Sequence, residues 1–168
     1  MLKLYNTLSR KKETFGSPST TLRANKINLF VCGPTVYDLS HLGHARTYIV
    51  FDMIVKYLRQ KGFNVFYLQN ITNIDDKIIN RAKETKISWK VLGRRFEKEY
   101  LKDMKGLKVS SVSKYARATD HIKEIISQTE RLLKKGYAYE IKRDGIYYDI
   151  AKFKEYGKLS KRTIKSAE

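Results

Sequence analysis

The order of three segments early in the chain most constrains its fold. Residues 27–32 (Ile-Asn-Leu-Phe-Val-Cys) are short, apolar and partly β-branched, and the breaker pair Gly33-Pro34 follows at once, which is typical of a buried strand that ends in a loop. Residues 43–60 change to helical spacing, with Gly62 placed to end the helix. Residues 64–68 are strand-like again. This order predicts a βαβ unit with parallel strands and a right-handed crossover.

Helical periodicity and capping residues predict four helices before residue 137. The first should begin near His44 and bury one apolar face, formed by Ile49, Val50, Met53, Ile54, Tyr57 and Leu58. Asn73 and Thr119 are placed to cap the second and fourth helices, and a regular apolar stripe predicts a third from about Ser88. Residues 109–115 can form a third strand.

These elements together predict an α/β fold, a Rossmann-like doubly wound parallel sheet. We expect residues 1–135 to form part of this domain. After them the pattern changes to two alternating segments joined by Asp144-Gly145, which predicts a β-hairpin. Residues 151–168 are basic and poor in apolar side chains, so residues 136–168 are expected to be the start of a second, incomplete unit.

Charge and composition limit the classes of function that the chain can have. The chain has 35 Lys and Arg against 17 Asp and Glu, a net charge of +18, which favours a polyanionic partner such as nucleic acid. Because the basic residues are spread along the whole chain, a solvated lysine-rich surface is an equal alternative. No apolar run approaches the roughly 20 residues of a membrane-spanning helix, and residues 1–17 lack the apolar core of a secretory signal. A single cysteine excludes an internal disulfide, and we expect a cytoplasmic protein.

The stretch His41-Leu42-Gly43-His44 carries the clearest chemical signal. It lies between the first predicted strand and the first predicted helix, in the crevice where open α/β sheets bind ligands. Two histidines three residues apart project to the same side of a helix start, and Gly43 allows a nucleotide to approach the backbone. The unpaired N–H groups of a helix N-terminus suit phosphate. The alternative is that both histidines only cap or pack the helix.

Residues 31–47 (Val-Cys-Gly-Pro-Thr-Val-Tyr-Asp-Leu-Ser-His-Leu-Gly-His-Ala-Arg-Thr) resemble the "HIGH" region of class I aminoacyl-tRNA synthetases in its cysteinyl form, with Leu42 where isoleucine is usual. Residues 4–8, 70–78 and 116–122 resemble further segments of that family. The resemblance implies the fold of the HIGH-type nucleotidyl transferases. It also implies that residues 1–135 are the amino-terminal half of the catalytic domain and that residues 136–168 begin its connective-peptide insertion.

The resemblance implies a two-step reaction. Cysteine and ATP with Mg²⁺ give cysteinyl-adenylate, and the cysteinyl group then passes to tRNA(Cys). His41 and His44 would be catalytic, within an ATP-binding region made of Pro34, Thr35, His41, Leu42, Gly43 and His44. Gly33 and Thr72 would lie beside the amino acid. Cys32 matches one of four zinc ligands, whose other members come from sequence that this chain lacks.

The resemblance therefore predicts a fragment rather than a complete enzyme. No loop like Lys-Met-Ser-Lys-Ser, the family's second clamp on ATP, is present. We expect a monomer that is inactive alone, binds zinc weakly or not at all, and needs the carboxyl-terminal remainder of the enzyme. For Cys32 the alternative is a small buried hydrophobic residue.

Several other readings remain open. The chain could be a cysteine ligase with an amino-sugar acceptor, a small nucleotidyltransferase of the same superfold, or a basic RNA-binding module without catalysis. Asp75-Asp76 could hold magnesium, although a charged first helical turn is the more favoured interpretation. The basic pair Lys142-Arg143 could contact RNA, while the neighbouring tyrosines are expected mainly to pack across strands.

Overall fold

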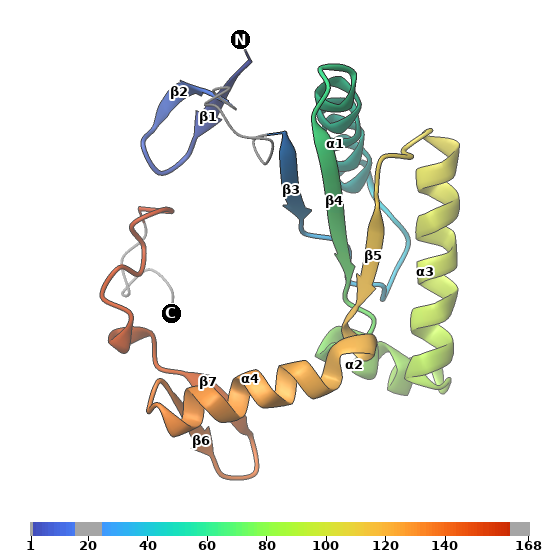
Figure 1. Cartoon of the computed structure of the whole chain (residues 1–168). Coiled ribbons are helices and arrows are strands. Elements are labelled where there is room, and N and C mark those ends of the chain that lie inside the picture. Colours follow the sequence, from blue (N-terminus) through green and yellow to red (C-terminus); the bar gives the residue numbers. More distant parts are fainter. Residues whose placement is uncertain (1, 16–24, 162–168) are drawn as a thin grey trace. The chain divides into compact units, whose positions relative to one another are not determined.

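The computed structural model describes residues 2–15 and 25–161 and contains two compact units (Figure 1). One unit spans Thr20–His121 and is called the sheet unit below. The other combines Met1–Ser19 with Ile122–Glu168 and is called the hairpin unit. Within the described ranges, no helix is long and apolar enough to cross a membrane.

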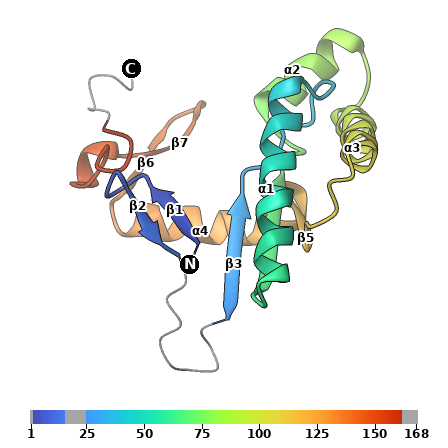
Figure 2. The ribbon, with the colours of Figure 1, turned by 90° about the horizontal axis from the view of Figure 1, so that it is seen from above.

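The sheet unit is built on three parallel strands in the order β3-β4-β5 (Figure 1), with β3 and β5 as its outer strands (Figure 2). They are β3 (Lys26–Val31), β4 (Asn64–Ile71) and β5 (Lys114–Arg117). β3 pairs with β4 along its whole length, and β5 pairs with the carboxyl-terminal half of β4. The predicted α/β fold with a parallel sheet is therefore confirmed.

Helices make the crossovers between these strands. α1 (Leu42–Gln60) joins β3 to β4, while α2 (Asp76–Thr85) and α3 (Trp89–Gly106) lie between β4 and β5. A short 3₁₀ helix, η1 (Ala118–His121), follows β5. α3 begins close to Ser88, as predicted, and Ser88 is its N-cap, whose hydroxyl accepts a hydrogen bond from the Lys90 N–H at 3.3 Å.

One face of the sheet carries the core. On β4, alternate side chains are buried, namely Val65, Tyr67, Gln69 and Ile71, while those between them are exposed or half-buried. The buried side chains meet α1 and α3. Ile71 packs with Val36, Ile78, Leu92 and Phe96, so the predicted apolar stripe of α3 is confirmed as core.

The predicted caps of α2 and α4 are wrong for a shared reason. Asn73 and Thr119 bind one another, with Asn73 Nδ2 donating to Thr119 Oγ1 at 2.8 Å and the Thr119 N–H donating to Asn73 Oδ1 at 3.1 Å. Asp75 caps α2 instead, accepting from the Lys77 N–H at 2.8 Å. A contact across 46 residues has no periodicity in the sequence, so local rules assigned both side chains to the nearest helix.

The third strand starts later than predicted, at Lys114 instead of Val109. The chain leaves α3 through a turn, and the N–H groups of Ser110 and Ser111 donate to the Asp52 carboxylate at 2.8 and 2.7 Å. Because these donors bind a side chain, residues 110–111 do not pair with β4, and backbone contact with β4 begins only at the Ser113 N–H, which donates to the Tyr67 carbonyl oxygen at 2.8 Å.

α1 begins at Leu42, two residues before the predicted start, and buries a different face from the predicted one. The buried residues are Tyr48, Asp52, Val55 and Leu58, whereas Ile49, Val50, Met53 and Tyr57 are exposed. Only Leu58 of the predicted face is buried, and Ile54 is half-buried. The reason is that α1 has apolar side chains on more than one side, so periodicity did not identify which one meets the sheet.

The hairpin unit contains α4 (Ile122–Lys134) and two antiparallel pairs. The first pair is β1 (Lys3–Asn6) with β2 (Lys11–Thr14), and the second is β6 (Ala138–Ile141) with β7 (Gly145–Tyr148). The predicted hairpin is thus confirmed, although its loop is residues 142–144. The rings of Tyr139 and Tyr147 lie opposite one another with centroids 6.0 Å apart, which confirms cross-strand packing for this pair.

Candidate active site

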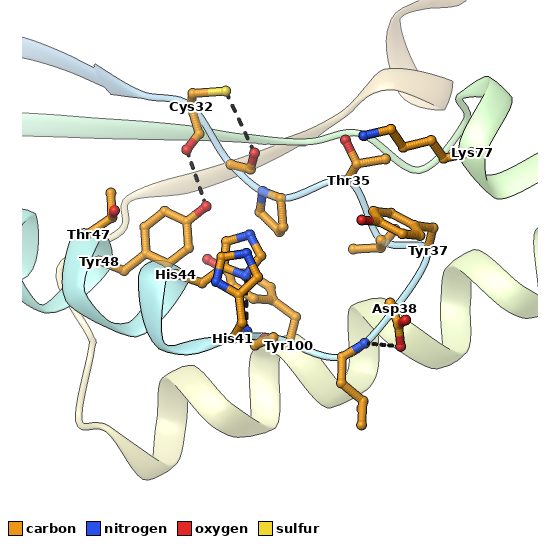
Figure 3. A pocket seen from close by; sticks show the side chains of 15 residues that line it. Cys32, Thr35, Tyr37, Asp38, His41, His44, Thr47, Tyr48, Lys77 and Tyr100 are labelled. Atoms are coloured by element: carbon orange, nitrogen blue, oxygen red, sulfur yellow. Dashed lines mark hydrogen bonds between the residues drawn. The ribbon is translucent and has the colours of Figure 1, made fainter.

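A pocket of about 390 Å³ lies at the carboxyl end of β3 (Figure 3). The loop from Cys32 to His41 forms one wall, and His44, Thr47 and Tyr48 of α1 form another. Lys77 of α2 and Tyr100 of α3 complete the lining. All of these residues belong to the sheet unit.

The pocket brings together most, but not all, of the predicted site residues. Its lining includes Cys32, Gly33, Pro34, Thr35, His41 and His44. Leu42, Gly43 and Thr72 are not part of the lining. The Leu42 side chain points into solvent and is 85% exposed.

His41 and His44 form a reciprocal cap at the N-terminus of α1. His41 is the N-cap residue, and its Nδ1 accepts a hydrogen bond from the Gly43 N–H at 3.1 Å. The Nδ1 of His44 accepts from the His41 N–H at 3.3 Å. The two rings stack with centroids 4.0 Å apart. Both histidines therefore cap the helix, but capping uses only one nitrogen of each ring.

This cap fixes the tautomer of both imidazoles. A neutral imidazole that accepts at Nδ1 carries its proton on Nε2. The pair therefore offers two N–H donors beyond the helix start, where the helix dipole also favours an anion. His44 is kept neutral near pH 7, because burial and then the charge on His41 hold the pKa of His44 below its ordinary value.

The remaining electrostatics of the pocket also favour an anion. Among the described lining residues Asp38 is the one carboxylate, and Arg81 neutralises it through a 2.9 Å ion pair. Lys77 lies at the pocket with its Nζ 5.5 Å from the centre of the Tyr37 ring. The sequence analysis did not assign Lys77 to the site, because its neighbours in sequence suggested only a charged helical turn.

Position 33 requires a glycine because the chain just after β3 approaches the end of β4 closely there. A Cβ at this position would lie 1.6 Å from the Asn70 carbonyl oxygen, so any side chain forces the backbone to move. The Gly33 N–H donates to Asn70 Oδ1 at 2.7 Å, and Asn70 Nδ2 donates to Thr72 Oγ1 at 3.3 Å. Thr72 therefore supports the pocket floor through Asn70 and a parallel bridge to Thr35.

Cys32 lies at the rim of this pocket with an exposed thiol. Its exposure argues against the alternative of a small buried hydrophobic residue. Within residues 2–15 and 25–161, no group of three or more His, Cys, Asp or Glu side chains is arranged to hold a metal ion. A structural or catalytic zinc site needs at least three protein ligands, so the donors described here do not form one.

Two tyrosines of the pocket lining donate hydrogen bonds, and one of them, Tyr48, holds the Cys32 segment in place. Tyr48 Oη donates to the Cys32 carbonyl oxygen at 3.2 Å, and Tyr100 Oη donates to Gln69 Oε1 at 2.9 Å. Burial, together with the charge on Cys32, raises the pKa of Tyr48 to about 12, so its phenol keeps the proton that it donates. Sequence reasoning missed this role of Tyr48, although its position four residues after His44 places both on one side of α1.

Comparison with known proteins identifies the family. The family described as tRNA synthetases class I (C) catalytic domain matches residues 18–168. Two structures of methionyl-tRNA synthetase from Mycobacterium tuberculosis, each with methionyl-adenylate, superpose at TM-scores of 0.63 and 0.60. They are 22% and 23% identical, and the match covers 68% and 67% of this chain and 23% of theirs. The family match over residues 18–168 places the chain among the class I tRNA synthetase catalytic domains, and the two solved structures share its fold.

Sequence relatives narrow this class to one family. The cysteine–tRNA ligase of Thermoplasma volcanium is 52% identical over 161 residues, which are 96% of this chain and 34% of that protein. The corresponding ligase of Pyrococcus furiosus is 54% identical over 160 residues, 95% of this chain and 32% of that protein. The chain belongs to the cysteine family of class I tRNA synthetases and spans about a third of the length of these curated relatives.

Proposed function

We propose that this chain is the ATP- and cysteine-binding portion of a cysteine–tRNA ligase. The observation that carries the proposal is the His41–His44 pair, whose Nε2 donors lie at a pocket that also contains Cys32. The identity of 50–54% to cysteine–tRNA ligases along nearly the whole chain supports this reaction over an amino-sugar acceptor.

In the first step, a carboxylate oxygen of cysteine attacks the α-phosphorus of ATP with its Mg²⁺, and pyrophosphate leaves. Negative charge is concentrated on the phosphoryl oxygens in the transition state. The Nε2–H groups of His41 and His44 donate to these oxygens, and the N-terminus of α1 adds the field of its dipole. Neither histidine forms a covalent bond, so both act by positioning and charge stabilisation.

The other predicted residues have supporting roles in this proposal. Gly43 keeps the helix start free of a side chain, while Pro34 and Thr35 shape the wall that faces the nucleotide. Leu42 is largely exposed at the helix start, and we propose that it offers an apolar contact to the nucleotide outside the pocket lining. Gly33 and Thr72 hold the floor on which the amino acid lies.

In the second step, a ribose hydroxyl at the 3′ end of tRNA(Cys) attacks the carbonyl carbon of cysteinyl-adenylate, and AMP leaves. The net charge of +18 favours the approach of RNA. Lys142 and Arg143 are exposed in the β6–β7 loop, and we propose that they contact the tRNA backbone. The cytoplasm is the proposed compartment, since tRNA is aminoacylated there.

Cys32 is the proposed contribution of this chain to a zinc site. Zinc takes a thiolate readily and a hydroxyl poorly, which would separate cysteine from serine. The described donors do not complete such a site, so the other ligands belong to polypeptide outside the described residues. The chain alone should retain less than one equivalent of zinc, as measured by metal analysis after gel filtration.

The proposal also includes a partner. This partner is the part of the enzyme that corresponds to the two thirds of each relative's length that the chain does not cover. We keep the predicted boundary at residues 135 and 136 between the catalytic half-domain and the insertion as part of this proposal.

Cysteine-dependent exchange of pyrophosphate into ATP tests the reaction. The chain is assayed alone and joined to the part of the Thermoplasma volcanium ligase that follows the aligned segment. We expect exchange only in the joined protein, with cysteine preferred to serine. His44→Ala should lower the exchange rate by roughly 100-fold or more, as for other groups that stabilise transition-state charge.

His121→Ala is the matched control, because His121 lies in η1 and does not line the pocket. Equal rates for His44→Ala and the unaltered joined protein would refute the proposed role of the histidine pair. Exchange that is independent of cysteine would refute the choice of substrate.

A further inference from the structure

Two hollows lie side by side along α3. One has a volume of about 180 Å³ and the other a volume of about 470 Å³. Asn73, Arg94 and Thr119 line both of them, so the two hollows form one groove, which we call the α3 groove. It lies within the sheet unit, and its lining shares no residue with the pocket at the end of β3.

Basic side chains at a regular spacing line the α3 groove. Lys90, Arg94 and Lys98 follow one another at intervals of four residues on α3, and all three are exposed. Residues four apart lie on one side of a helix, and each step advances about 6 Å along its axis. The groove therefore contains a row of three positive charges, which we call the α3 cations.

The acidic residues of the groove do not neutralise this row. Glu97 is 8% exposed and accepts a hydrogen bond at its Oε1 from Arg117 Nε at 2.7 Å. Asp120 is also within reach of Arg117, with Asp120 Oδ2 4.0 Å from Arg117 Nη1. In the part of the chain that the structure describes, none of the α3 cations forms an ion pair. The row is therefore available to an anion.

The α3 cations cost the helix stability and bring it no structural gain. The first turn of α3 contains no acidic residue and instead holds Lys90, at the positive end of the helix dipole where a cation is unfavourable. Like charges four residues apart also repel one another. A local arrangement that opposes stability without compensation is expected at functional sites.

An aromatic side chain lies at one end of the row. Trp89 is half-buried and lines the smaller hollow, with Lys90 Nζ 5.5 Å from the centre of its ring. Gly93 lines the same hollow and contributes no side chain to it. A positively charged groove with an accessible aromatic ring is the usual means of binding single-stranded nucleic acid, because the charges take the phosphates and the ring stacks on a base.

The α3 groove adjoins the pocket at the end of β3. A Cβ on Gly93, which lines the groove, would lie 4.0 Å from Cγ2 of Val36, which lines the pocket. Asn73 of the groove directly follows Thr72, which supports the pocket floor through Asn70. A strand bound in the groove is therefore close to the pocket.

We propose that the α3 groove binds single-stranded RNA, with phosphates against the α3 cations and a base stacked on Trp89. This inference rests on the proposed function for the source of the RNA, a strand of the tRNA near its reacting 3′ end. It names a surface of the sheet unit, separate from the β6–β7 loop, on which that strand lies.

The emission of Trp89 tests the site directly, because it is the chain's single tryptophan. The chain is titrated with a single-stranded RNA of about eight nucleotides, a length within the usual range of such grooves. We expect saturable quenching of the emission that follows the same curve as fluorescence anisotropy of the RNA carrying a label. A fully paired RNA of equal length should quench less, since its bases are already stacked on one another.

Two double variants test the α3 cations. Arg94→Gln with Lys98→Gln should weaken binding about tenfold at roughly 0.15 M salt and reduce the slope of log K against log salt by about 1.4, as for two lost phosphate contacts on a single strand. Glutamine keeps a similar helix propensity, so both variants should fold. Arg95→Gln with Lys105→Gln is the matched control, because these residues lie on the same helix, carry the same charge and do not line the groove. It should leave the slope unchanged.

Several outcomes overturn the inference. They are RNA binding without a change in Trp89 emission, an equal loss of affinity and slope in the two double variants, and equal binding and quenching by paired RNA. The test requires no catalysis, so its result is separate from that of the proposed function. RNA bound in the groove of a chain whose joined form lacks cysteine-dependent exchange would uphold the inference and refute the function. Exchange in the joined protein without RNA binding in the groove would do the reverse.

Discussion

Replacement of Asp52 by alanine should cost the sheet unit a large part of its stability. Asp52 lies in the middle of α1 and is 5% exposed. Its Oδ1 accepts from the N–H groups of Ser110 and Ser111 at 2.8 and 2.7 Å, and its Oδ2 pairs with Lys56 Nζ at 2.6 Å. These contacts fasten α1, whose N-terminus carries the histidine pair, to the loop that leads into β5.

The magnitude follows from these contacts. Each hydrogen bond to a charged group contributes roughly 1.5–3 kcal/mol. The Lys56 side chain is half-exposed, so its ion pair adds at most about 1 kcal/mol. After the desolvation of the carboxylate is subtracted, we expect Asp52→Ala to lower the free energy of unfolding by about 3–4 kcal/mol at pH 7.

The effect of Asp52 should depend on pH in a defined direction. Burial raises the pKa of the Asp52 carboxyl, but hydrogen bonds from Lys56, Ser111 and Ser110 together outweigh burial and leave this pKa below its ordinary value of 3.8. A carboxyl with a lowered pKa in the folded state stabilises the fold above its ordinary pKa, and this contribution is lost as the pH falls through the folded value. The difference between the two proteins should therefore be constant from pH 5 to 8 and shrink below about pH 4.

Urea unfolding followed by fluorescence measures this difference, because the chain's single tryptophan, Trp89, lies in the sheet unit. Lys56→Met is the control that leaves the backbone hydrogen bonds of Asp52 in place. It removes the exposed half of the ion pair and the hydrogen bond from Lys56 Nζ to the Lys108 carbonyl oxygen at 3.1 Å, and it should cost no more than about 1–2 kcal/mol. An Asp52→Ala protein whose free energy of unfolding lies within about 1 kcal/mol of that of the unaltered chain at pH 7 would refute the assignment of the stability to the backbone hydrogen bonds. The assignment would also be refuted if Lys56→Met cost as much stability as Asp52→Ala.

Three further changes test the site. Gly33→Ala should destabilise the chain by roughly 1–3 kcal/mol in urea unfolding, because its Cβ meets the Asn70 carbonyl oxygen; an unchanged midpoint would contradict the close approach. Tyr48→Phe should cost roughly 0.5–1.5 kcal/mol in the same assay through loss of the bond to Cys32, and a neutral result would show that the phenol does not hold that segment. In an NMR titration, His44 should protonate below its ordinary pKa of 6.5, remaining neutral at pH 7; a midpoint above 6.5 would contradict burial as the main cause.

Much of the fold was predictable because it depends on local chemistry. The apolar strand before Gly33-Pro34, the start of α3 near Ser88 and the apolar stripe of α3 each follow from neighbours within a few residues. The order of strands and helices then left a parallel sheet as the consistent arrangement. The His41–His44 motif was found for the same reason, since its spacing is that of a single helical turn.

Other features needed the tertiary structure. Asn73 and Thr119 have the side chains of helix caps but bind one another across the fold. An aspartate such as Asp52 is indistinguishable in sequence from a surface residue on α1, and only the position of residues 110–111 makes it a buried acceptor.

The sequence by itself determined the parallel βαβ unit, the position of the histidine motif after the first strand, and the resemblance to the cysteine family. Each of these features depends on residues that are consecutive in the chain. The tertiary structure decided which face of α1 is buried, how each histidine divides its two nitrogens between the helix cap and the pocket, and which face of the sheet stays open. These properties depend on contacts between residues far apart in the chain, and such contacts have no period or spacing in the sequence.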